Sequence, residues 1–442
     1  MGTKIQSHSG RRRVDGALRT SDEVGRFRSY ATPGMVEVEP GPGLASIRRR
    51  PYHQVSKISG QLWQRQKIGG SALGASARSR LYFEDVLNVL SCFAVVALHC
   101  SLGVFGPDRG HEWNIALAQQ AAFIFAVPVF MMLSGANLMG YRTRYTTREF
   151  FRKRVLRVGV ALLVGSAACY LAYGLFPDSF WGARDIARDF SPRAFAHGLL
   201  GNTINDTYWF FYAIIGVYCV TPLLSLAADR PRLLRGLLAG GFLLAFVAPT
   251  LSWAHLVRPE DVSAVQGWPL LANTSVFYFL LGHYLSGHVP DTRAVRVAAV
   301  VATLASPALM YAIGHAVNVS SPTYDSYPVN AFFPLAATYA AGLFCVVRML
   351  EPRLRALGGR AKGALVTLSS ASLYVYLFHI PVINWLGVNA TPELRACFVE
   401  YPLYEALAVF VLVGVPSVAY AAVRRAAKRR SHGAVRAGGA VR

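Results

Sequence analysis

Residues 82–101 read YFEDVLNVLSCFAVVALHCS, a stretch that is polar at its start and mostly apolar from Val86 onward. An apolar run of about 20 residues is long enough to cross the hydrocarbon core of a bilayer as a helix. Two polar side chains, Asn88 and His99, lie within this apolar part. The stretch therefore predicts a transmembrane helix that carries polar groups inside the membrane.

Similar apolar runs recur along the rest of the chain, several of them bounded by Pro, Gly or the Trp and Tyr residues that favour membrane interfaces. They predict an all-α fold, a polytopic membrane helical bundle. No sequence repeat relates the two halves, which weakens a transporter interpretation built on inverted repeats. About ten transmembrane helices are expected, at residues 85–104, 116–139, 155–176, 208–228, 233–254, 271–289, 294–315, 330–350, 365–388 and 404–423.

The composition separates the membrane part from the two ends of the chain. Of the 442 residues 53% are hydrophobic and 15% are charged, whereas soluble chains carry about 25% charged residues. Residues 1–80 are basic and rich in Gly, Ser and Arg, which predicts a disordered cytoplasmic tail. Residues 81–425 are predicted to form the transmembrane domain, and residues 426–442 a second basic cytoplasmic tail. No cleavable signal peptide is expected, because the first apolar run begins far from the start.

The net charge of +22 invites a nucleic-acid-binding interpretation, which the position of the basic residues disfavours. With the N-terminus placed in the cytoplasm, the cytoplasmic connections and the C-terminal segment hold 24 Lys and Arg residues, and the opposite loops hold 6. This asymmetry follows the positive-inside rule and predicts that both termini are cytoplasmic. The six cysteines are scattered and mostly apolar in context, so we expect buried hydrophobes and neither disulfides nor a metal site.

Three histidines, His99, His283 and His379, lie inside predicted spans, where ionisable residues are costly. Asn88 lies eleven residues before His99, so the two share one helix face. His379 shares a face with three polar residues, Ser369, Ser372 and Tyr376. His99 and His379 also lie at the same depth, about 21 to 22 Å from their helix starts. They are therefore predicted to line one cavity, although each could instead serve helix packing by bonding a backbone carbonyl.

Histidine suits acyl transfer, because a neutral imidazole can take the proton of a hydroxyl as it attacks a thioester. A nearby hydrogen-bond donor must then stabilise the oxyanion. Arg154 and Arg157, three residues apart at the predicted cytoplasmic mouth, could hold the phosphates of coenzyme A. The alternative for both arginines is a positive-inside anchor without any ligand.

Five segments of this chain, in the same order, resemble the acyltransferase-3 family. They cover roughly residues 80 to 425, and each is a weak match alone, but together they are specific. The segments are Tyr82–Ser101, Val127–Leu138 (VPVFMMLSGANL), Phe150–Arg157 (FFRKRVLR), Tyr208–Leu223 (YWFFYAIIGVYCVTPL) and Ser372–Pro381 (SLYVYLFHIP).

The resemblance implies a multi-pass enzyme of the inner membrane with no bound cofactor. Such an enzyme takes acetyl or another short acyl group from acyl-coenzyme A, and its acceptor is a hydroxyl of a lipid-linked, cell-surface or exported saccharide. The essential histidine of the family falls on His99, and the place of its usual arginine, eleven residues earlier, is taken by Asn88. The candidate catalytic residues are His99 and His379, and the candidate substrate-binding residues are Asn88, Ser134, Arg154, Arg157, Tyr208, Trp209 and Tyr376.

Two other functions stay open at this point. Many spans with polar stripes would also serve a glycolipid transporter or flippase, and asparagine in place of the family arginine would suit a catalytically inactive scaffold. The expected partners are the lipid bilayer, the acyl donor and the saccharide acceptor, and not nucleic acid. Transfer or hydrolysis of the acetyl group of acetyl-coenzyme A by the purified protein would separate an enzyme from the other two.

Overall fold

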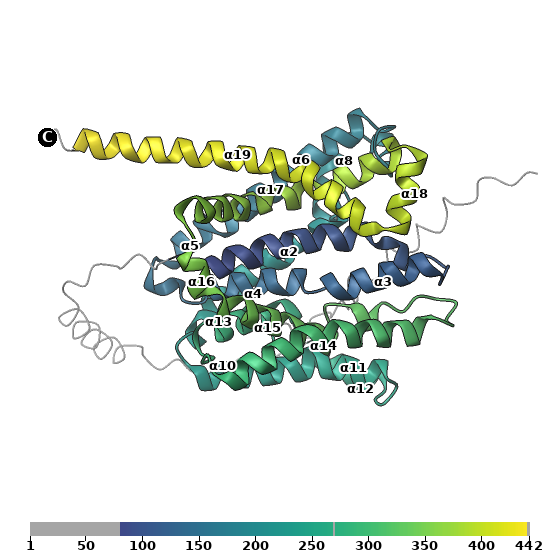
Figure 1. Cartoon of the computed structure of the whole chain (residues 1–442), viewed down its shortest axis with the longest axis horizontal. Coiled ribbons are helices and arrows are strands. Elements are labelled where there is room, and N and C mark those ends of the chain that lie inside the picture. The colour runs from purple at the N-terminus through teal and green to yellow at the C-terminus, as the bar shows by residue number, and fades with distance from the viewer. Residues whose placement is uncertain (1–79, 268–269, 440–442) are drawn as a thin grey trace, which may run out of the picture. The chain divides into compact units, whose positions relative to one another are not determined.

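The computed structural model describes residues 80–267 and 270–439, and within these ranges every regular element is a helix (Figure 1). The predicted tail at residues 1–80 lies outside the described residues except for its last one. Residues 426–439, part of the second predicted tail, continue a helix. The helices are α2 (Tyr82–Cys100), α3 (His111–Phe123), α4 (Ala126–Leu138), α5 (Thr147–Lys153), α6 (Val155–Leu175), α7 (Arg184–Arg188), α8 (Pro192–Leu200), α9 (Trp209–Leu224), α10 (Pro231–Phe242), α11 (Ala248–Trp253), α12 (Pro259–Gln266), α13 (Thr274–Gly287), α14 (Arg293–Asn318), α15 (Pro334–Met349), α16 (Glu351–Ala356), α17 (Gly359–Asn389), α18 (Pro392–Glu400) and α19 (Pro402–Gly439).

Nine helical segments of the described chain are long and apolar enough to cross a membrane. They coincide with nine of the ten predicted spans, so the chain is a multi-pass membrane protein with an all-α fold. The remaining prediction, residues 271–289, forms the shorter helix α13 of 14 residues. The helix begins late because Asn273 caps it, accepting a hydrogen bond from the backbone N–H of Val276. The side of the membrane on which each terminus lies stays a prediction.

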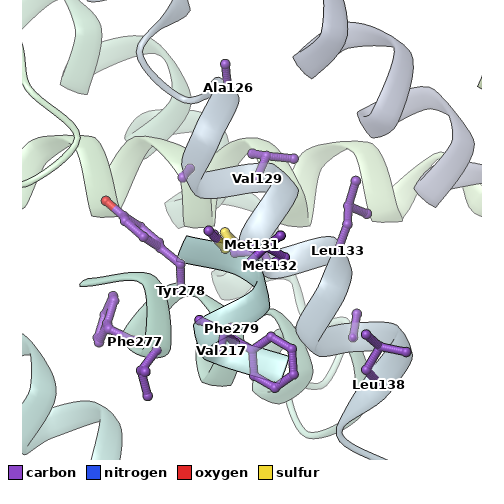
Figure 2. Close-up of a cluster of buried hydrophobic side chains, with 14 of the residues drawn as sticks. Ala126, Val129, Met131, Met132, Leu133, Leu138, Val217, Phe277, Tyr278 and Phe279 are labelled. Carbon is purple, nitrogen blue, oxygen red and sulfur yellow. The ribbon is translucent and has the colours of Figure 1, made fainter. Parts of the chain in front are cut away.

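Helix α13 lies inside the bundle. It packs against α4, α9, α10 and α15, and seven of its residues are buried. Figure 2 shows its crossing with α4, where Met131 and Met132 of α4 lie close to Phe279 of α13. At this crossing a β-carbon on Gly135 would lie 1.7 Å from the carbonyl oxygen of Phe279. A side chain at this position would therefore force the two backbones apart.

Helix α2 lies in the middle of the bundle and contacts α3, α4, α15, α17 and α19. In Figure 1, α17 and α19 lie on one side of α2, while α10 and α14 run along the opposite edge. Helices α17 and α19 also pack against each other, as do α14 and α15. The two predicted polar stripes, on α2 and α17, are thus carried by neighbouring helices.

Candidate active site

The polar faces of α2 and α17 meet, and the two histidines meet with them. The ring centroids of His99 and His379 are 5.3 Å apart, with the ring planes inclined by 45°. This distance is well within one helix diameter of about 10 Å. The two histidines therefore lie side by side, while a cavity lined by both of them stays a prediction.

Hydrogen bonds between the same two helices hold this pair in register. Asn88 donates from Nδ2 to the carbonyl oxygen of Ser369 at 2.8 Å and to its Oγ at 2.9 Å. One turn further along α2, the thiol of Cys92 donates to the carbonyl of Ser372 at 3.6 Å. The spacing of these polar residues along both helices therefore aligns His99 with His379.

The surroundings of His379 define which of its ring nitrogens is available for chemistry. Its Nδ1 lies 2.8 Å from the carbonyl oxygen of Tyr376. Because a carbonyl only accepts hydrogen bonds, Nδ1 carries the hydrogen in this contact, and in the neutral ring Nε2 keeps its lone pair. The side chain is fully buried, and Nε2 has no hydrogen-bond partner among the described residues. The ring therefore makes the backbone contact expected of a packing histidine and still offers one free basic nitrogen.

A short 3₁₀ turn, η4 (Asp206–Tyr208), is tied to α17 next to the histidine pair. Tyr376 donates through its hydroxyl to the carbonyl of Thr207 at 2.7 Å. Tyr208 donates in the other direction, to the carbonyl of Leu377 at 2.6 Å. The exposed carboxylate of Asp206 interacts electrostatically with both His99 and Tyr376. The sequence interpretation missed Asp206, although this residue lies only two positions before the aromatic segment Tyr208–Leu223.

A cavity of about 570 Å³ opens on one side of the pair, and we call it the arginine-lined cavity. Four of the predicted site residues line it: Asn88, Ser134, Arg157 and Tyr376. It is also lined by Phe130, Val158, Phe210, Phe211, Ile214, Tyr218, Ser369, Ser370, Ser372, Leu373, Tyr374, Ala421, Arg424 and Arg425.

Five predicted site residues are not in the lining of this cavity: His99, His379, Arg154, Tyr208 and Trp209. Arg154 stands at the break between α5 and α6, where it caps one helix and begins the next. Tyr208 is buried and serves to hold α17, whereas Trp209 is 45% exposed.

The cations of this cavity come from two distant parts of the sequence. Arg157 lies near the start of α6, while Arg424 and Arg425 belong to α19 and entered the sequence analysis only in the count of basic residues of the C-terminal segment. Arg424 donates to the hydroxyl of Tyr374 at 2.8 Å, and Arg425 donates to the carbonyl of Gly363 at 2.9 Å. Among the described lining residues none is acidic, so the cavity is positively charged.

A second cavity, of about 370 Å³, opens at the other ends of the same two helices, and we call it the carboxylate-lined cavity. It begins at Cys100, the residue after His99, and reaches Leu386 of α17. Its charged lining residues are Asp108, Glu112, Arg395 and Glu405. Along α17 the arginine-lined cavity ends at Tyr376, so the histidine pair lies between two cavities of opposite charge.

Comparisons with known proteins give one finding. A protein-family model described as an acyltransferase domain, that of acyltransferase 3, matches residues 81–422. No curated protein and no solved structure matches the chain. Among the described residues, no group of three or more His, Cys, Asp or Glu side chains could hold a metal ion.

Proposed function

Since the chain belongs to the acyltransferase-3 family, we propose that it moves an acetyl or other short acyl group from acyl-coenzyme A to a saccharide hydroxyl. The acceptor would be a lipid-linked, cell-surface or exported glycan, and the enzyme would work in the inner membrane. The observation that carries this proposal is the pair His99 and His379, with its ring centroids 5.3 Å apart, between two cavities of opposite charge.

The arginine-lined cavity suits the donor, because coenzyme A carries phosphates that guanidinium groups bind well. Arg157, Arg424 and Arg425 line it together. Arg154 lies three residues before Arg157, and its buried Nε has no hydrogen-bond partner among the described residues. A bound phosphate would give that nitrogen a partner. The positive-inside asymmetry supports a cytoplasmic position for these arginines, on the side where acyl-coenzyme A would be available.

The carboxylate-lined cavity suits the acceptor, because carboxylates accept hydrogen bonds from sugar hydroxyls. Glu405 of α19 and Cys100 both line this cavity, and Cys100 follows His99 directly. A hydroxyl held near Glu405 would therefore approach His99 from the side opposite the donor.

In the reaction, His99 accepts the hydroxyl proton while the hydroxyl oxygen attacks the thioester carbonyl carbon. The carbon–sulfur bond then breaks, and the coenzyme A thiolate takes the proton from the imidazolium of His99. Bond changes and protons balance without a further reactant. His379 offers a lone pair at Nε2 beside His99 and can orient the ring or share the proton.

Replacing His99 by alanine tests the proposal. With the purified full chain in nanodiscs, we expect release of coenzyme A from acetyl-coenzyme A to fall by at least about 100-fold. Glycan acetylation in cells should be lost while the protein stays inserted and abundant. His197, exposed on α8, gives the matched control, since its alanine variant should keep full activity. Unchanged acetylation in the His99→Ala variant would contradict the proposal and favour a glycolipid transporter.

A further inference from the structure

Four of the aromatic rings that line the arginine-lined cavity pack against one another, and we call them the aromatic wall: Phe130, Phe210, Phe211 and Tyr376. Phe210 lies at the centre of the group. Its ring centroid is 5.9 Å from Phe130, 6.3 Å from Phe211 and 5.5 Å from Tyr376. The rings of Phe211 and Tyr376 also meet edge to face, at 5.3 Å.

The wall is held from three helices, so it is not free to swing aside as a unit. Phe130 belongs to α4, Phe210 and Phe211 to α9, and Tyr376 to α17. The hydroxyl of Tyr376 is bonded to the carbonyl of Thr207, and Phe211 is only 3% exposed. Closely packed aromatic rings of this kind resist the insertion of extra atoms.

The wall borders the histidine pair at Tyr376. Along α17 the cavity is lined from Ser369 to Tyr376, a rise of about 10 Å. The next contact is with the pair itself, because the ring of Tyr376 lies 5.6 Å from that of His379. Along α9 the lining runs in the opposite chain direction, from Tyr218 to Phe210. A thioester that enters with its phosphates at the arginines therefore presents its acyl group to the wall.

From this arrangement we infer that the aromatic wall limits the length of the acyl chain, and that Phe210, which contacts the other three rings, sets the limit. The inference rests on the proposed function, since it assumes that this cavity holds the acyl donor. Each methylene beyond the acetyl group has to displace a packed ring, and the cost rises with every carbon. Removing the ring of Phe210 should raise the affinity for longer acyl chains, because the added methylenes fill the space that the ring vacated.

The test is the affinity of the full chain in nanodiscs for coenzyme A, acetyl-, butyryl- and hexanoyl-coenzyme A. For the natural chain we expect the affinity to fall beyond acetyl. In the Phe210→Ala variant butyryl-coenzyme A should bind at least about tenfold more tightly than acetyl-coenzyme A, since each buried methylene contributes about fourfold. The Phe130→Ala variant removes a wall ring from another helix and should shift the preference in the same direction.

Phe242 of α10 provides the matched control, because it is half-buried like Phe210 and packs with Phe246 and Phe277, outside the cavity lining. The Phe242→Ala variant should keep the natural chain-length profile. If every thioester binds but Phe210→Ala and Phe130→Ala leave the profile unchanged, the inference is overturned and the donor site stands. If the natural chain binds no coenzyme A thioester, both the proposed donor site and the inference are wrong.

Discussion

Two helix pairs in this bundle are built in opposite ways. At the crossing of α4 and α13, a β-carbon on Gly282 would lie 1.9 Å from the carbonyl oxygen of Met132, so the backbones touch. At the pairing of α2 and α17, side-chain hydrogen bonds from Asn88 and Cys92 join the helices, and two imidazoles lie between them. The first pair packs backbone against backbone at its two glycines, whereas the second brings two imidazoles together, polar groups that a membrane interior disfavours.

The difference shows which contacts serve the fold alone. Close approach of helices over small residues maximises van der Waals contact and is the usual source of stability inside a bilayer. Buried ionisable residues contribute less than such packing and cost more to insert, so their presence at α2 and α17 indicates chemistry. Substitutions of the glycines at the first pair should therefore act on folding, and substitutions of the two histidines at the second pair on the reaction.

The largest effect is expected from Gly282→Ala, which places a β-carbon against the backbone of Met132. The two helices would have to separate, at a cost of about 3 kcal/mol or more. We expect little monodisperse protein in size-exclusion chromatography and a lower thermal unfolding temperature. Gly287 lies on the same helix with open space around it, so Gly287→Ala should behave as the natural chain does. Normal stability of the Gly282→Ala variant would remove the distinction between the two helix pairs.

The next effect, on rate and not on stability, is expected from His379→Ala. Loss of the basic Nε2 beside His99 should lower kcat by about 100-fold with the KM for acetyl-coenzyme A nearly unchanged. Stability should change little, because the Nδ1 bond to Tyr376 lies within one helix. Single-turnover kinetics and thermal unfolding measure the two quantities. A marked loss of stability with a normal rate would show that His379 serves packing alone.

The sequence predicted the α2–α17 pairing because its polar residues recur at helical spacing in two apolar runs, and polar faces avoid lipid. The span predicted at residues 271–289 is longer than α13, because hydropathy detects neither the Asn273 cap nor the packing of neighbouring helices around this segment. The approach of Arg424 and Arg425 to Arg157 depends on how α19 packs against α17, which no local pattern records. Asp206 was missed for the same reason, because hydrogen bonds between η4 and α17 hold its turn in place.

A smaller effect is expected from charge reversal in the arginine-lined cavity. Arg157→Glu should raise the KM for acetyl-coenzyme A about tenfold, the loss of roughly one charge-assisted contact to phosphate. Arg154→Glu should have a similar effect if its buried Nε binds the donor. Arg258, exposed on the predicted opposite side, is the control, and Arg258→Glu should leave KM unchanged. A change in membrane insertion without a change in KM would identify the two arginines as anchors.

The smallest effect is expected at Asn88, where the natural chain departs from the family arginine. Its amide donates twice to Ser369 across the helix pair, at 2.8 and 2.9 Å. Polar contacts between membrane helices average about 0.6 kcal/mol each in double-mutant cycles, so Asn88→Ala should lower the free energy of unfolding by about 1 kcal/mol. A looser pairing of α2 and α17 should also reduce the transfer rate by a few fold.

A double-mutant cycle with Ser369→Ala measures whether Asn88 joins helices or binds substrate. A helix contact predicts a coupling free energy of about 0.5 kcal/mol in unfolding, since the Oγ of Ser369 accepts one of the two bonds. It also predicts a nearly constant KM for acetyl-coenzyme A. Asn88 lines the arginine-lined cavity as well, so a direct role in binding would give the reverse pattern, a raised KM without coupling. The first result would mean that this chain binds its donor with arginines from α6 and α19, and uses the α2 position to align the two histidines.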